Sequence, residues 1–267
     1  MKPFEDARLR LNRAKLHGER LAANWNEIPP EELYSVESNV NPDGTGSLRL
    51  ARVKPVSDDF SLLLGEMLYH LRASLDACLY QAAIYTTGRN PPPDEQKLEF
   101  PICSNKVEFP AIAKRRLSIF PQQIQDAIER IQPYNIPTLP PSEIVKNINR
   151  SLSILNDLAR KDRHRKLHLV GAWAIELDPV FDLPEGVIVS RLHVRDVGFL
   201  ENDNELANFQ LKGYVGGMRL SANPRLLVSI GLNEPPLRCD ISDTFDRRLE
   251  EIINAVHSVI TAFENYY

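Results

Sequence analysis

Cysteine is scarce in this sequence, whose 267 residues contain three, at Cys78, Cys103 and Cys239. Three widely spaced thiols argue against a disulfide framework and against a cysteine-rich zinc site. Cys78 lies in a helical apolar pattern, where a thiol acts as a small core residue. The shortage of cysteine is typical of a protein from a reducing compartment, so we expect a cytoplasmic location.

Long apolar runs are also missing. No stretch approaches the ~20 apolar residues that a membrane-spanning helix needs. The first 20 residues are charged from Lys2 onward and contain no apolar stretch, so we expect neither a secretory signal nor a membrane partner. The hydrophobic content of 43% is ordinary for a globular protein with a proper core. We therefore expect a soluble globular protein.

An overall excess of positive charge is absent too, because the net charge is −4. One segment departs from this balance. Residues 159–168 carry five Arg or Lys side chains and one acidic side chain, a local charge of +4, which leaves −8 for the rest of the chain. A concentrated basic segment on an acidic protein predicts a site for an anion or for the acidic face of a partner.

Apolar residues recur three and four positions apart in several segments, which predicts helices. The predicted helices cover residues 3–27, about 58–87, 105–118, 121–132, a long stretch beginning after Ser142, and 242–267. Ser57-Asp58 is the predicted N-cap of the second helix. The two clearest apolar stripes are Leu64, Leu68, Leu71, Leu75, Leu79 and Ala82, and Phe245, Leu249, Ile252, Val256, Val259 and Phe263.

Strand-like alternation appears in two regions. Residues 33–40 and 47–53 flank the turn-forming segment 41–46, which predicts a β-hairpin. After His168 the pattern changes from helical to strand-like, and four segments follow that predict an antiparallel meander: 169–177, 186–197, 209–220 and 225–232.

These elements predict an α+β fold: a helical bundle with an inserted antiparallel sheet and a closing C-terminal helix. We expect one domain, residues 1–267, with two lobes. The first lobe, 1–168, is mainly helical with the hairpin near 33–54, and the second, 169–232, holds the antiparallel strands. The helix at 242–267 is expected to pack back on the bundle, against the early helices.

The basic segment contains both arginine and histidine side chains, which have different roles in phosphodiester cleavage. Arginine carries a permanent charge and a forked donor suited to phosphate, and histidine titrates near neutrality and can move protons. Phosphodiester cleavage without a metal needs both. On a helix, Arg160, His164 and His168 share one face, and Arg160 and Arg165 are the predicted anion-binding residues. The alternative is a solvated helix end whose cations favour the helix dipole.

Residues Arg163-His164-Arg165-Lys166-Leu167-His168 resemble the signature of the HEPN superfamily, an arginine, a polar residue, about three variable positions and a histidine. HEPN proteins are helical bundles, often dimeric, and many are metal-independent ribonucleases or toxins. The resemblance implies that Arg163 and His168 form a catalytic pair, that His164 supports them, and that the protein acts on RNA as a homodimer. It covers six residues of 267.

A broader resemblance involves two longer segments, 155–168 and 65–82. They are similar to an uncharacterised bacterial protein family, and this likeness implies no activity.

The helix at about 58–87 carries a second candidate group. Glu66 and His70 are four residues apart, as are Arg72 and Asp76, so each pair can meet on a helix face. Glu66, His70 and Asp162 are therefore predicted supporting residues, with His70 as a second proton-transfer group on the opposite wall of a site. The alternative is a set of ordinary exposed pairs, each worth a few tenths of a kcal/mol.

A metal site is not expected. His164 and His168 have the spacing of two zinc ligands on a helix, but Arg165 occupies the position of the glutamate in a His-Glu-x-x-His motif. The neighbouring cations would repel a metal ion. We expect no cofactor either.

Three interpretations of the basic segment stay open. In the first, Arg163, His164 and His168 form an RNA-cleaving site. In the second, the segment binds a nucleotide, another anion or a protein partner without chemistry. In the third, it ties the bundle to the strands, with His168 and Asp162 buried and paired. The residues favour the second and third together over the first, which is the most specific of the three.

Overall fold

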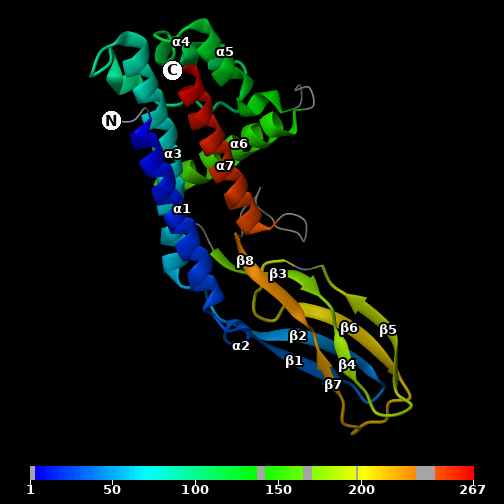
Figure 1. The fold of residues 1–267 in the computed structure, drawn as a ribbon. Coiled ribbons are helices and arrows are strands. Elements are labelled where there is room, and N and C mark those ends of the chain that lie inside the picture. Colours follow the sequence, from blue (N-terminus) through cyan, green and yellow to red (C-terminus); the bar gives the residue numbers. More distant parts are fainter. Residues whose placement is uncertain (1–3, 137–141, 165–169, 197, 233–243) are drawn as a thin grey trace. The chain divides into compact units, whose positions relative to one another are not determined.

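The computed structural model describes residues 4–136, 142–164, 170–196, 198–232 and 244–267, and the side chains of Arg163 and His164 are not part of this description. The chain has the predicted α+β fold and divides into two compact units (Figure 1). Unit 1 comprises Met1–Leu21, Ser61–His168 and Arg247–Tyr267, and its described elements are helical. Unit 2 comprises Ala22–Phe60 and Leu169–Asp246 and contains the strands.

The predicted helices are confirmed. They are α1 (Glu5–Asn26), α3 (Asp58–Thr87), α4 (Phe109–Arg116), α5 (Gln122–Arg130), α6 (Glu143–His164) and α7 (Phe245–Tyr266). Three short helical elements are also present: α2 (Pro30–Leu33), η1 (Glu95–Lys97) and η2 (Pro133–Asn135). Of the predicted capping residues Ser57 and Asp58, Ser57 caps α3, because its Oγ accepts a 3.3 Å hydrogen bond from the Asp59 amide.

The core of unit 1 follows the helical apolar stripes. All six residues of the predicted α3 stripe are 0% exposed, and the six residues of the α7 stripe are buried as well. α1 packs against α7, as expected: Arg8 donates hydrogen bonds to Glu264 and Thr261, and the rings of Phe4 and Phe263 lie 6.2 Å apart. Burial of these stripes is what holds the helices together.

Unit 2 consists of antiparallel strand pairs. A four-stranded sheet has the order β1-β2-β6-β5, and two separate pairs are β3-β8 and β4-β7. The strands are β1 (Tyr34–Val40), β2 (Thr45–Val53), β3 (Val170–Leu177), β4 (Val180–Asp182), β5 (Ile188–Val194), β6 (Glu205–Lys212), β7 (Ser221–Asn223) and β8 (Leu226–Leu232).

The simple meander predicted for residues 169–232 is wrong. Its first and last strands, β3 and β8, pair with each other, and β5 and β6 are the neighbouring strands that pair as a meander requires. The predicted hairpin, β1 and β2, joins the same sheet because β2 pairs with β6, with Leu48 opposite Ala207. The hairpin therefore belongs to unit 2 and not with the helices, because backbone pairing ties it to the later strands.

Gly46 lies where β2 meets a neighbouring aromatic ring. A Cβ atom at this position would stand 2.3 Å from Cζ of the buried Phe209 and 2.8 Å from the Asn39 carbonyl oxygen. We expect Gly46→Ala to destabilise unit 2 by about 1–3 kcal/mol, the usual cost of overpacking. Both tryptophans of the chain, Trp25 and Trp173, lie in unit 2, so tryptophan fluorescence during urea denaturation measures this loss.

Gly216→Ala is the matched control for this substitution. A Cβ atom on Gly216 would meet Pro42 at an ordinary 3.9 Å, so the urea midpoint should stay within the scatter of surface substitutions. Equal midpoints for the two variants would contradict the close contact of Gly46 with Phe209.

Candidate functional site

The three predicted supporting residues line one cavity in unit 1. Glu66 and His70 come from α3 and Asp162 comes from the last turn of α6. The cavity has a volume of about 410 Å³ and is called the histidine pocket below. Its complete lining is Arg13, His17, Leu62, Gly65, Glu66, Tyr69, His70 and Asp162.

Two stacked imidazoles form the centre of the histidine pocket. The rings of His17, on α1, and His70, on α3, have centroids 5.5 Å apart and an interplanar angle of 10°. Oε2 of Glu66 lies 3.1 Å from Nδ1 of His17. The predicted partner of Glu66 was His70, one turn along the same helix, but its carboxylate reaches the histidine of the neighbouring helix instead. Glu66 therefore orients His17 and leaves Nε2 of that ring for other partners.

The surroundings of His70 disfavour its charged form. Partial burial lowers its pKa below the ordinary imidazole value, and interactions with His17, Arg13 and Arg10 act in the same direction, while Glu66 opposes them. Nδ1 of His70 is buried and has no hydrogen-bond partner among the described residues. An imidazole in this state can accept a proton at neutral pH.

Asp162 brings the end of α6 to the pocket. Its carboxylate lies against Gly65 of α3, and a Cβ atom on Gly65 would be 2.9 Å from Oδ1 of Asp162. The glycine therefore allows the two helices to approach at this point. Asp162 is half-buried, and its Oδ1 has no hydrogen-bond partner within the described part of the chain.

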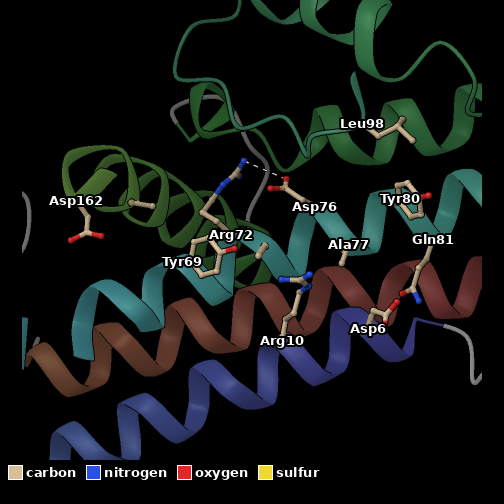
Figure 2. A pocket seen from close by; sticks show the side chains of 12 residues that line it. Asp6, Arg10, Tyr69, Arg72, Asp76, Ala77, Tyr80, Gln81, Leu98 and Asp162 are labelled. Atoms are coloured by element: carbon tan, nitrogen blue, oxygen red, sulfur yellow. Dashed lines mark ion pairs between the residues drawn. The ribbon is translucent and has the colours of Figure 1, made fainter. Parts of the chain in front are cut away.

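A second cavity of about 540 Å³ adjoins the first, because Tyr69 and Asp162 line both. We call it the Arg72 pocket (Figure 2). Arg72 is 6% exposed and its Nη2 donates a 3.2 Å hydrogen bond to the Phe100 carbonyl oxygen. The amide of Phe100 in turn donates to Oδ1 of Asp76 at 2.8 Å. Phe100 thus fixes the segment 98–103 against α3.

Charged side chains surround Arg72. Its Nη2 lies 3.6 Å from Asp76 and 3.5 Å from Glu99, and Glu99 also forms an ion pair with Arg116. Burial raises the pKa of Asp76, and the charge of Arg72 opposes this effect. The predicted pair of Arg72 and Asp76 is therefore present, but Arg72 is buried and does not lie on an exposed helix face.

The residues predicted to be catalytic lie mostly beyond what the structure describes. Arg163 and His164 form the last turn of α6, without described side chains. Arg165 and His168 fall in residues 165–169, outside the described residues. Arg160 is exposed on α6. Of the predicted site residues, Glu66, His70 and Asp162 are the ones that the described structure brings together.

Sequence reasoning missed His17 and Arg13. The buried face of α1 consists of Ala7, Leu11, Ala14, His17 and Leu21, so a histidine occupies a regular core position of an amphipathic helix. Arg13 stands four residues before it and can therefore lie on a neighbouring part of the same face. A titratable side chain at a core position was the signal that could have identified this pair.

Neither a metal-binding cluster nor a membrane-spanning helix occurs among the described residues. No cluster of three or more His, Cys, Asp or Glu side chains there has a geometry suited to a metal ion. Among the described helices, none has the length and apolar character required to cross a membrane. Comparison with known proteins found no matching family model, no matching curated protein and no matching solved structure.

Proposed function

We propose that this protein binds RNA and cleaves it without a metal ion at the histidine pocket. One observation carries the proposal: two imidazoles, His17 and His70, stack 5.5 Å apart in a cavity that also contains Arg13. Metal-free cleavage of a phosphodiester needs a base, an acid and a cation. The pocket contains a side chain for each of these roles.

The residues have distinct roles in the proposed reaction. His70, whose pKa is lowered, removes the proton from a ribose 2′-hydroxyl, and the 2′-oxygen attacks the adjacent phosphorus. The bond from phosphorus to the 5′-oxygen breaks, and His17, oriented by Glu66, donates a proton to that oxygen. Arg13 stabilises the negative charge that develops on the phosphoryl oxygens. The products are a 2′,3′-cyclic phosphate and a 5′-hydroxyl end.

The basic segment supports an RNA substrate. Residues 159–168 carry a local charge of +4, and Asp162 in the middle of this segment lines the histidine pocket. Arg160 is exposed next to it. Because phosphate contacts dominate the affinity of proteins for nucleic acid, this segment is suited to holding the backbone of RNA while the reacting phosphate enters the pocket.

The test is incubation of the purified full chain with a labelled single-stranded RNA in EDTA. We expect cleavage with 2′,3′-cyclic phosphate ends and no cleavage of DNA of the same sequence, since DNA has no 2′-hydroxyl. Arg13→Gln should lower the rate about 100-fold, the lower end of the usual range for loss of one charge-stabilising donor, because Arg13 is exposed.

Arg89→Gln is the control, because Arg89 is exposed in the loop after α3 and lines neither pocket. It should cleave like the wild type. Intact RNA after incubation with wild-type protein from pH 5 to pH 9, for both single-stranded and hairpin substrates, would overturn the proposal. Equal cleavage by wild type and Arg13→Gln would contradict the role given to Arg13.

A further inference from the structure

The apolar stripe of α6 is covered along only part of its length. Leu152, Leu155 and Leu158 are 0% exposed, whereas Ile144 on the same stripe is 70% exposed. Ile148, which lies between them, is half-buried. Apolar surface that a fold leaves uncovered in this way marks a binding site for another molecule.

A cavity of about 290 Å³ opens where the stripe is uncovered, and Ile148 lines it. Its other walls come from α5 and α7, which belong with α6 to unit 1 (Figure 1). We call it the apolar groove, because most of its described lining is aliphatic or aromatic, for example Ile124, Ile131, Val259 and Phe263. Its volume is at the lower end of the usual range for small-ligand sites.

A hydrogen bond closes one end of the groove. The hydroxyl of Tyr266, at the end of α7, donates to Oε1 of Gln123, at the start of α5, over 3.3 Å. From this bridge the lining continues along α5 to Arg130 and along α7 to Ser258, a rise of about 10–12 Å on each helix at 1.5 Å per residue. An extended chain advances about 1.2 Å per bond, so about ten carbon atoms span this length.

The other end of the groove carries a positive charge. Arg130 is the last residue of α5 and is exposed, and its carbonyl oxygen accepts a 3.3 Å hydrogen bond from Nδ2 of Asn149 on α6. The backbone of Arg130 is therefore fixed while its guanidinium faces solvent. The described lining of the groove contains no carboxylate. A guanidinium in this position is suited to a carboxylate ligand, which it can bind through two hydrogen bonds.

We propose that the apolar groove binds a straight-chain carboxylate of about eight to ten carbon atoms, the length that the two helices set. The alkyl chain lies between α5, α6 and α7 with its methyl end toward the bridge of Gln123 and Tyr266, and the carboxylate binds Arg130. The site shares no described lining residue with the histidine pocket or the Arg72 pocket, and it does not rest on the proposed function above.

The experiment is calorimetric titration of the full chain with decanoate, decan-1-ol, decyltrimethylammonium and butyrate, each kept below the concentration at which it forms micelles. We expect decanoate to bind at least tenfold more tightly than each of the others. The alcohol has no charge for Arg130, the ammonium is repelled by it, and butyrate is too short to cover the apolar walls. No binding of decanoate, or an affinity of any other compound within tenfold of it, would overturn the proposal.

Arg130→Gln tests the charged end of the groove. It should weaken decanoate at least tenfold and leave decan-1-ol unchanged, because only the carboxylate depends on the guanidinium. Arg115→Gln is the matched control, since Arg115 is an exposed arginine near the end of α4 and does not line the groove. Decanoate affinity that is equal in Arg130→Gln and wild type would contradict the assignment.

Ala127→Leu tests the apolar part of the groove. Ala127 is exposed in the middle of α5 and lines the groove, so a leucine there should occupy the space of the alkyl chain and weaken decanoate and decan-1-ol at least tenfold. Leucine is a good helix former, and circular dichroism at 222 nm should show unchanged helix content. Ala111→Leu, at an exposed position of α4 outside the groove, should bind like the wild type. Wild-type affinity in Ala127→Leu would place the ligand elsewhere and overturn the site.

Discussion

His70→Gln is expected to lower the rate of RNA cleavage by about 10²–10⁴-fold, the usual contribution of a general base. The expectation follows from the position of His70 in the histidine pocket and from burial, which lowers its pKa. Glutamine keeps approximately the size and polarity of histidine but cannot accept a proton. Because His70 is half-buried and forms no side-chain hydrogen bond through Nδ1 to described residues, the free energy of unfolding should change little.

The pH profile gives this prediction a second measurement. A base with a lowered pKa stays neutral to lower pH than a free imidazole, whose pKa is about 6.5. The acid limb of the wild-type pH profile should therefore lie below that value, where His70 becomes protonated. In His70→Gln this acid limb should disappear from whatever residual rate remains.

His257→Gln is the matched control for His70→Gln. His257 also has a pKa lowered by burial, but it lies on α7 and lines neither pocket. Its substitution should leave the cleavage rate and the pH profile unchanged. A loss of activity of the same size in both variants would show that the effect is general to the helical unit.

Phe100→Ala is expected to destabilise unit 1 by about 3–5 kcal/mol, the cost of deleting a fully buried aromatic side chain. Phe100 is 0% exposed. Its backbone also exchanges hydrogen bonds with Arg72 and Asp76, so the ring is held at one place on α3. The surrounding side chains therefore have little freedom to fill the cavity, which places the cost in the upper part of the range for core deletions.

Circular dichroism at 222 nm during urea denaturation measures this loss, because the helices of unit 1 dominate that signal and both tryptophans lie in unit 2. Val107→Ala is the control: Val107 is 84% exposed, and such a substitution changes stability by no more than about 0.5 kcal/mol. A loss below 1 kcal/mol for Phe100→Ala would falsify the view that this ring anchors the segment to α3.

The helices could be predicted from the sequence because their pattern is local. Residues three and four apart share a helix face, so the stripe from Leu64 to Ala82 defines the buried side of α3 without knowledge of its neighbours. The hairpin at residues 34–53 is local in the same sense, since the turn at 41–46 joins adjacent strands. The structure confirms both elements.

The pairing of strands depends on distant residues. Alternation indicates which side of a strand is buried but not which partner it takes. β3 pairs with β8 over a long separation in sequence, with Val170 opposite Leu232, and β2 pairs with β6. These contacts depend on loop closure and on the packing of the whole unit, so the predicted meander failed. Strands do form in the predicted segments 169–177, 186–197 and 225–232, but the predicted strand 209–220 ends at Lys212.

For the candidate site, too, the sequence determined some features and the tertiary structure decided others. The sequence by itself determined that positive charge gathers at residues 159–168 and identified Glu66, His70 and Asp162 as candidate site residues, because charge and helical spacing are properties of neighbouring residues. Tertiary structure alone decided that His17 stacks on His70, that Glu66 turns to His17, and that Asp162 rests on Gly65. These contacts join α1, α3 and α6, and only packing of helices that are distant in sequence can bring such side chains together.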